Sequence, residues 1–503
     1  MPATLATFGP MLKDFYQGPV AESINQRVWA REYFSKRSKG WSGRQMIIPV
    51  HTGRNTGVGF RAEGVALPVA GDQAYVNLTI PNRNSYGRFE VSGESMDTAM
   101  RGGAGAFAGV MESEMNRLVQ DVSNAENHAT IFGGEVKGFL NERKVGAVSL
   151  GAQTPLGAPA TGFSATETWQ YQGDFSYFDG TATGTAVQTG LAVADIATKV
   201  RVRLFRMDTY AEILGGAAAQ NPNILVDDFT DDRVNPTISL IVGDDAGGAG
   251  IDTSALPGGT AIAVVISATQ AVSAATPLFG QDPIGAANPT GLIWPQLIAD
   301  QPAGIFTNLA SQAHFGINRA GALPANANAI LQSTILTHDP AAGAGTGDRT
   351  NAAADLTLER IQYLFDTLLQ DAGADPNLMI MNALMRHRYT VQLTGTLGAA
   401  GANRSNLTVD AGSGKVMDNQ QNLAYGGVMF QYDRHFPICT IGFMSTDPWL
   451  FAELTTGQFA DDDGNVLSRT QNTDAWEGFW KHRYNLVCRR PNSQALLVGI
   501  TPT

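Results

Sequence analysis

The sequence has 503 residues, of which 43% are hydrophobic and only 16% charged, with 56 glycines and a formal net charge of −12. This length suffices for two to four compact units, and the low charge suits a protein that buries surface against neighbours. The acidic balance argues against a protein that reads nucleic-acid sequence, because such proteins concentrate basic side chains on one face.

The cysteines, the apolar runs and the first residues of the sequence bear on where the protein is located. The two cysteines, Cys439 and Cys488, lie in apolar strand-like runs, which predicts a reducing compartment and no disulfide. No apolar run approaches the ~18 residues of a membrane-spanning helix, and the first residues lack the pattern of a secretory signal. We therefore expect a protein made in a cytoplasm, with no membrane contact.

Residues 1–45 are predicted to form an arm. Up to residue 60 the chain holds eight basic side chains and three acidic ones. An amphipathic helix is expected over Ala21–Phe34, and the SKRSKGWSGR stretch then interrupts it. A solvated surface is the simpler interpretation of these basic residues, with a specific anion site as the alternative.

From Gln45 to Glu94 the apolar residues alternate, which predicts β-strands. The two best strands, over 75–80 and 88–92, follow a long polar loop rich in Gly, Pro, Asn and Arg. A loop of this length is uncommon inside a compact domain. The pattern therefore predicts a two-stranded finger that leaves the body and lies on another subunit.

The longest helical pattern runs from about Asp97 to Ile131, and Gly133 and Gly134 are expected to end it. We call it the spine helix. Its predicted apolar stripe consists of Phe107, Met111, Met115, Leu118, Val122, Ala125 and Ala129. The opposite, exposed face is predicted to carry Glu112, Asn116, Gln120, Asn124 and Asn127.

After the spine helix, residues 140–285 show short alternating strands separated by Gly-rich turns, typical of an inserted antiparallel barrel or sandwich. An αβα unit follows. Its first helix has an apolar face from Leu358 to Ala372, residues 378–381 form a buried strand, and a second helix begins at Ala383. Further strands are predicted over 427–432, 438–444, 449–454, 479–489 and 494–500.

The search for chemistry yields no convincing motif. The loop at Gly412–Lys415 is similar to a phosphate loop, but it lacks the first glycine and the Ser or Thr after the lysine. The Asp461–Asn465 turn lacks the glycine position and the final glutamate of a calcium loop. The seven histidines are scattered, with none spaced as metal ligands on one helix face. We therefore expect no enzyme, and no catalytic, cofactor or metal site.

The order of these elements resembles the major capsid protein of tailed bacteriophages, with the Hong Kong 97-like shell fold. The resemblance rests on LPVAGDQAYVNLTIPNRNSYGRFEVSGESM before the spine helix, on LTLERIQYLFDTLLQDAGADPNLMIMNALMRHRY, on GVMFQYDRHFPICTIGFMSTDPW and on NLVCRRPNSQALLVGI, together with NPTGL and HFGINRA. These stretches span about residues 10–135 and 286–503, and residues 140–285 depart from the minimal family member.

The resemblance implies an α+β fold with an N-terminal arm, an extended E-loop hairpin, a P-domain with the long spine helix, an A-domain, and an inserted β-rich domain. The implied boundaries are 1–45 for the arm, 46–95 for the E-loop, 96–139 for the spine helix, 140–285 for the insertion, 286–350 for P-domain and linker, 351–445 for the A-domain, and 446–503 for the P-domain return and C-terminal A-domain strands.

The implied function is structural: hexamers and pentamers that build an icosahedral capsid (virion shell) around double-stranded phage DNA, held without sequence specificity. An encapsulin-like nanocompartment is the alternative, and a soluble α/β enzyme is a third interpretation. Because the predicted finger already begins near Gln45, the resemblance implies a separate scaffolding protein rather than a fused one. A portal protein is a further implied partner, and a decoration or cement protein is left open.

Two sets of residues are singled out for assembly. Both signs of charge in the predicted finger are expected to pair across an intersubunit contact. These residues are Arg54, Arg61, Glu63, Asp72, Arg83 and Arg88. Glycines at the start of the spine helix lower its stability and are expected to let that end bend as the shell matures. They are Gly102, Gly103, Gly105 and Gly109.

Some relatives weld their shells by an isopeptide bond between a finger lysine and an asparagine of a neighbour. The stretch from Gln45 to Glu94 contains no lysine, since Lys39 is followed only by Lys137. Arginine cannot replace the nucleophile because its guanidinium stays protonated. The sequence therefore predicts a shell without covalent cross-links.

Overall fold

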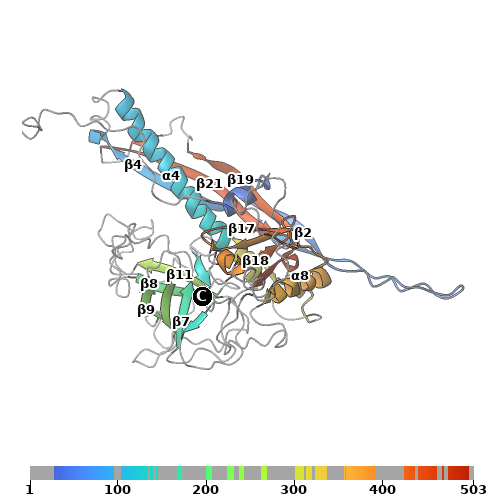
Figure 1. The fold of residues 1–503 in the computed structure, drawn as a ribbon. Helices are drawn as coiled ribbons and strands as arrows, with labels where there is room; N and C mark the ends of the chain where they lie inside the picture. Colours follow the sequence, from blue (N-terminus) through green and yellow to red (C-terminus); the bar gives the residue numbers. More distant parts are fainter. Residues whose placement is uncertain are drawn as a thin grey trace, which may run out of the picture.

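A computed structural model describes the fold. It covers residues 28–95, 104–133, 136–139, 143–145, 167–172, 200–206, 224–230, 237–242, 262–268, 301–310, 313–319, 323, 325–336, 356, 358–383, 385–390, 424–436, 440–460, 467–469 and 474–497. Helices and strands are both present, in an α+β arrangement (Figure 1).

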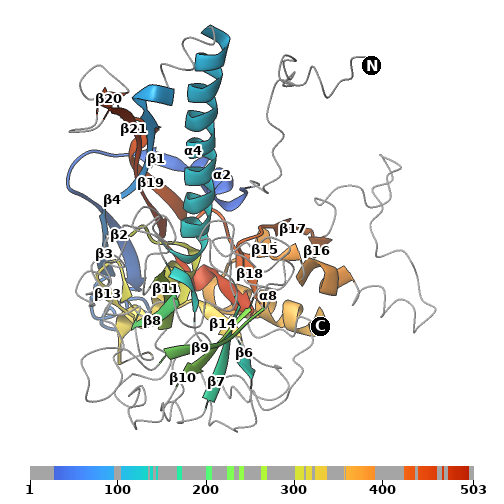
Figure 2. The same cartoon turned by 90° about the vertical axis from the view of Figure 1, so that its left-hand side faces the viewer.

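The spine helix is α4, Ala104–Phe132, with 29 residues and therefore a length of about 43 Å. Its predicted end is confirmed: Gly133 follows with φ of +99°, and its amide donates to the Ala129 carbonyl. The predicted start, before Ala104, lies outside the described residues. Figure 1 and Figure 2 show α4 running along the strands β4 and β21.

The sheet beside the spine helix, called the body sheet here, joins distant parts of the chain. Strand β21 (Ala475–Cys488) pairs antiparallel with β4 (Arg83–Ser92) along one side and with β19 (Trp449–Phe459) along the other. The short strands β20 (Ser468–Arg469) and β1 (Ser38–Gly40) complete it. At Gly87 a Cβ atom would come within 2.5 Å of Val122, so the absence of a side chain lets α4 approach β4 closely.

Two expectations are corrected here. The stretch over 88–92 was expected in the finger, but it belongs to β4 and pairs with β21 in the body sheet. The SKRSKGWSGR stretch was expected only to break a helix. Instead, Ser38–Gly40 forms β1, a parallel edge strand that pairs with Phe451–Glu453 of β19. It follows a short helix, α2 (Ala30–Ser35).

The predicted αβα unit is present, and its strand belongs to a second, six-stranded sheet. Helix α8 (Leu358–Ala372) ends at Gly373, whose φ is +57°. The buried strand β15 (Leu378–Met381) lies between β18 (Ile441–Met444) and β17 (Val428–Tyr432). The sheet is completed by β16 (Ala424–Tyr425), β22 (Ala495–Leu497) and β14 (Thr334–Leu336).

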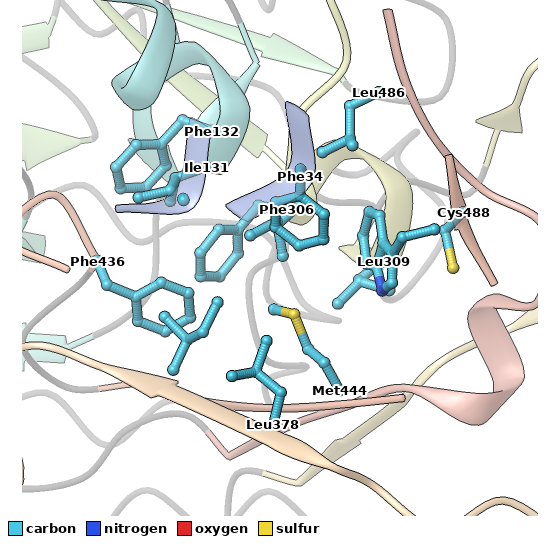
Figure 3. Packing of buried hydrophobic residues seen from close by; sticks show 14 of the residues in the cluster. Phe34, Ile131, Phe132, Phe306, Leu309, Leu378, Phe436, Met444, Leu486 and Cys488 are labelled. Carbon is cyan, nitrogen blue, oxygen red and sulfur yellow. The ribbon is translucent and has the colours of Figure 1, made fainter. Parts of the chain in front are cut away.

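The largest hydrophobic cluster joins these parts. Phe34 of the arm, Phe132 of the spine helix and Phe306 of α7 (Ile305–Ala310) are fully buried in it (Figure 3). Phe132 and Phe306 stack with 5.5 Å between ring centroids, and Phe34 lies 5.3 Å from Trp449. The arm is therefore part of the core.

The predicted strands of residues 140–285 are also present, in two antiparallel sheets. One has the order β6-β7-β10-β9 and the other β5-β11-β8. Their bounds are β5 Val136–Phe139, β6 Arg143–Val145, β7 Glu167–Gln172, β8 Val200–Arg206, β9 Ile224–Thr230, β10 Thr237–Val242 and β11 Ile262–Ala268. Strand β5 begins before residue 140. These sheets therefore include residues of the segment 96–139, which was assigned to the spine helix.

Candidate functional site

The first candidate site is the hairpin β2–β3, Gln45–Pro81, called the finger from here on. Strand β2 (Gln45–Gly53) pairs antiparallel with β3 (Ala74–Pro81), from Gln45 opposite Pro81 to Gly53 opposite Ala74. Residues 54–73 continue beyond the paired strands. Figure 1 shows this part leaving the body and extending away from it.

The root of the finger is anchored by one of its two faces. Leu78 and Ile80 are fully buried against Val487 of the body sheet and against Ile317 and Leu331. Ile317 belongs to a small hairpin of β12 (Ala313–His314) and β13 (Ile317–Asn318), and Leu331 ends the 3₁₀ helix η4 (Ala327–Leu331). The Thr79 amide also donates to the Phe315 carbonyl. The root is therefore fixed to the subunit.

The far part of the finger exposes large apolar side chains. Phe60 is fully exposed, and Val58, Leu67 and Val69 have exposed fractions of 84%, 85% and 87%. Val65 is also more than half exposed. The two chain segments of this part approach each other closely at Gly57 and Gly71. A Cβ atom added to Gly57 would lie only 2.9 Å from the backbone nitrogen of Gly71. An apolar surface of this kind is typical of a binding surface.

The predicted charged residues divide between two places. Arg54, Arg61, Glu63 and Asp72 lie exposed in the finger. Arg83 and Arg88 lie in β4 of the body sheet, and Arg88 contacts Glu477 of the same subunit at 2.7 Å. Contrary to expectation, Arg83 and Arg88 are therefore not in the finger. Sequence reasoning selected the charges and missed the apolar residues, although VGF and LPV within a Gly- and Pro-rich loop were a usable signal.

Two of the four glycines that were predicted to let the spine helix bend lie in the described part of the chain. Gly105 and Gly109 lie within α4, where the helix is continuous from Ala104. Gly102 and Gly103 lie outside the described residues. Their role in bending stays a prediction.

The second candidate site is a buried polar cluster at the C-terminal end of the spine helix. Glu126 accepts from Arg31 Nε at 2.6 Å and contacts His482 Nδ1 at 2.8 Å. The other ring nitrogen of His482 contacts Glu453 Oε1 at 3.1 Å. These residues join α2, α4, β21 and β19. They tie the arm and the spine helix to the body sheet.

Asn127, the next residue of α4, extends the cluster. Its side-chain nitrogen donates to both oxygens of Asp433, at 3.1 and 3.0 Å, and its side-chain oxygen accepts from the Arg31 amide at 2.9 Å. Asp433 also accepts from the His435 amide at 2.9 Å. Asn127 and Asp433 are buried.

Two expectations about α4 are wrong in this region. Asn127 was placed on the exposed face but is fully buried, and Ala125 was placed in the apolar stripe but is exposed. The histidines are also less scattered than expected, because the rings of His128 and His435 lie 5.6 Å apart in this cluster. The hydrogen-bond partners come from residues about 300 positions away, so no local pattern could reveal them.

Electrostatics in the cluster favour ionised Glu126. Burial acts to raise the pKa of Glu126, but the hydrogen bond and charge of His482 and the charge of Arg31 outweigh it, so the pKa is lowered. Tyr484, whose ring stacks on His482, has a pKa raised well above its ordinary value by burial and by the Glu126 charge. The tyrosine therefore stays neutral.

The remaining expectations concern the cysteines, two loops, metal binding and membrane spans. Cys488 is a buried free thiol whose pKa burial raises to about 12, whereas Cys439 lies outside the described residues. The loops at 412–415 and 461–465 also lie outside them. Where the structure describes the chain, no group of three or more His, Cys, Asp or Glu side chains could hold a metal ion. None of the described helices is long and apolar enough to cross a membrane.

Comparison with models of protein families gives no match, and comparison with curated proteins gives none either. Among solved structures, the chain is similar to the asymmetric unit of the cyanophage A-1(L) capsid, with a TM-score of 0.47 and 9% identity over 99% of this chain and 100% of that one. It is also similar to the capsid of the native GTA particle, with a TM-score of 0.43 and 10% identity over the full length of both chains. A structure of Mycobacterium phage Bobi gives a TM-score of 0.40 and 8% identity over 99% of each chain.

Proposed function

We propose that this chain is the shell-forming subunit of a phage-type capsid, with the arm, E-loop, P-domain and A-domain of the Hong Kong 97-like fold. In this proposal the finger is the E-loop and α4 is the spine of the P-domain. The subunits assemble as hexamers and pentamers into a closed icosahedral shell. The shell encloses double-stranded DNA without reading its sequence.

The observation that carries the proposal is the exposed apolar surface of the finger. Burying one such side chain contributes roughly 1.5–3 kcal/mol, so a subunit that holds five of them in water gains strongly from a contact with a neighbour. The root of the finger is fixed by buried side chains, whereas the part beyond Gly53 has no described contact with the body that would cover these residues. A second copy of the chain is the simplest partner.

The same proposal includes the further partners that such a shell needs. They are a separate scaffolding protein during assembly, a portal at one vertex, and, where the shell requires it, a decoration or cement protein. Assembly takes place in the bacterial cytoplasm, and the product is the virion capsid. An encapsulin-like compartment is the alternative shell, and no feature of the described residues favours it.

The test compares finger variants in an assembly assay. The double variant Phe60→Ser with Leu67→Ser removes two fully or largely exposed apolar side chains without touching the anchored root. We expect a folded subunit that no longer forms closed particles in sedimentation and electron microscopy. Ala66→Ser, exposed in the same finger, is the matched control and should assemble as the parent chain does.

Deleting Gly57–Gly71 is the stronger version of this test and should also leave a folded subunit. Circular dichroism and thermal unfolding of the soluble chain check the fold. Closed particles of normal size from the double variant or the deletion would contradict the assignment of the finger.

A further inference from the structure

His482 lies between two carboxylates that belong to different structural elements. Its Nδ1 is 2.8 Å from Glu126 Oε1 of the spine helix, and its Nε2 is 3.1 Å from Glu453 Oε1 of β19. The side chains of His482 and Glu126 are 3% and 2% exposed, and that of Glu453 is 16% exposed. Water can therefore replace little of either contact.

The chemistry of these three groups restricts their protonation. An ionised carboxylate only accepts hydrogen bonds, and a neutral imidazole has one N–H and one bare nitrogen. A neutral His482 can donate to one carboxylate, and its bare nitrogen then faces an oxygen of the other. When both carboxylates are ionised, both contacts are satisfied together only if both ring nitrogens carry hydrogen. Burial acts to raise the pKa of Glu126, but His482 and Arg31 together lower it, which favours the ionised form of that carboxylate.

The charges around His482 also sum to zero only when both of its ring nitrogens carry hydrogen. Glu126 and Glu453 contribute two negative charges, and Arg31, which contacts Glu126 at 2.6 Å, contributes one positive charge. The imidazolium supplies the second positive charge. The ring of His482 also contacts the rings of Phe451 and Tyr484, at 6.0 and 4.5 Å between centroids, and Tyr484 is neutral. Loss of the imidazolium proton leaves one largely buried carboxylate uncompensated, which is unfavourable.

We propose that His482 is a proton-dependent staple between the spine helix and the body sheet. With both nitrogens protonated it holds Glu126 and Glu453 together. When one proton leaves, one of the two carboxylates is released. Because Arg31 shares Glu126, and Ser38 donates to Glu453 at 2.5 Å, the attachment of the arm weakens with it. The staple is a property of the subunit and does not depend on the proposed function.

Glu453→Gln is the decisive variant. A glutamine side chain can donate its N–H to a bare imidazole nitrogen, so this variant no longer needs the second ring proton. The apparent unfolding midpoint of the full-length chain is measured at a fixed scan rate from pH about 5.5 to about 9, a range that brackets ordinary histidine titration. The parent chain should lose roughly 2 °C or more relative to Glu453→Gln as the pH rises.

Glu477→Gln is the matched control. It removes a carboxylate of the same sheet, on β21, whose partner Arg88 is exposed. This variant should keep the pH profile of the parent chain. If Glu453→Gln also keeps the parent profile, the staple is refuted.

A second measurement decides the matter if Glu453→Gln fails to fold. Ring ¹⁵N signals of His482, assigned by their loss in His482→Gln, report directly how many nitrogens carry hydrogen. We expect two protonated nitrogens at the acidic end of the range, and loss of one in the same pH interval in which the midpoint falls. A ring with one bare nitrogen throughout the range, or one that stays doubly protonated while the midpoint falls, would overturn the proposal.

Discussion

The carboxylate of Asp433 accepts a hydrogen bond from the backbone amide of Ala30, 403 residues earlier in the chain, at 3.0 Å. Ala30 is the first residue of α2, and Trp29 before it provides no side-chain cap. The first amides of a helix have no partner within the helix. Here Asp433, which directly follows β17, and Asn127 of α4 accept from the amides of Ala30 and Arg31, respectively. The arm helix is therefore capped by the body of the subunit.

Replacing Asp433 by alanine should destabilise the subunit by about 2 kcal/mol or more, because the Ala30 amide and the Asn127 side chain then lose a buried acceptor. Denaturant unfolding followed by tryptophan fluorescence measures this difference. Asp447→Ala is the control, since its side chain is 87% exposed and contacts Arg37 only at 3.5 Å. Equal costs for the two variants would show that the cap contributes nothing.

Local patterns in the sequence predicted the local elements well. Alternation predicted the paired strands β2 and β3, and the 3.6-residue period predicted α8 and the end of α4. The same patterns could not identify partners. The alternation of β4 indicates a strand, but its pairing with β21 joins residues that are about 390 positions apart. Such a pairing is decided by long-range packing.

The buried polar cluster was missed for a related reason. Asn127 stands among polar residues of α4, so the helical pattern placed it toward solvent, as is correct for most asparagines. It is buried because Asp433, Arg31 and His435 supply partners that only the folded chain brings together. The finger shows the opposite error. Its apolar residues have no periodicity, so the charged residues beside them drew the functional interpretation.

Acid should weaken the cluster through Glu126. Because the folded-state pKa of Glu126 is lowered, its contribution to stability is present above the ordinary glutamate pKa and is lost as the pH falls through the folded-state value. Glu126→Gln should therefore be less stable than the parent chain at neutral pH, and the difference should shrink on acidification below about 4.5.

Urea unfolding at a series of pH values checks this expectation. Glu90→Gln is the control, because Glu90 lies on the surface of β4 with its side chain 45% exposed. A difference between Glu126→Gln and the parent chain that stays constant down to pH 3 would contradict the linkage.

The glycines at the start of α4 should affect shell maturation if the proposed function holds. Each glycine within a helix costs up to ~1 kcal/mol relative to alanine, so Gly105→Ala with Gly109→Ala should stiffen this end of the helix. We expect slower or incomplete expansion of the precursor shell, followed by time-resolved scattering. Gly40→Ala, at an exposed glycine of β1 where an added Cβ atom would meet nothing within 4 Å, controls for glycine replacement outside the helix. Unchanged expansion kinetics in the double variant would count against bending at this site.

If the chain forms the proposed shell, the mature shell should contain no covalent links between subunits. The finger carries arginines but no lysine, and an isopeptide bond to an asparagine requires an amine that can lose its proton. The described cysteine, Cys488, is buried with a raised pKa, so it is a poor candidate for a disulfide between subunits. Mature particles boiled in detergent and reductant should therefore give a single band at the 53.3 kDa monomer. A ladder of oligomers from the parent chain that survives this treatment would disprove the argument.

The variant Arg61→Lys tests whether the missing amine is the only obstacle to an isopeptide bond. Its band should stay single unless a neighbouring subunit presents an asparagine and a carboxylate to the new lysine.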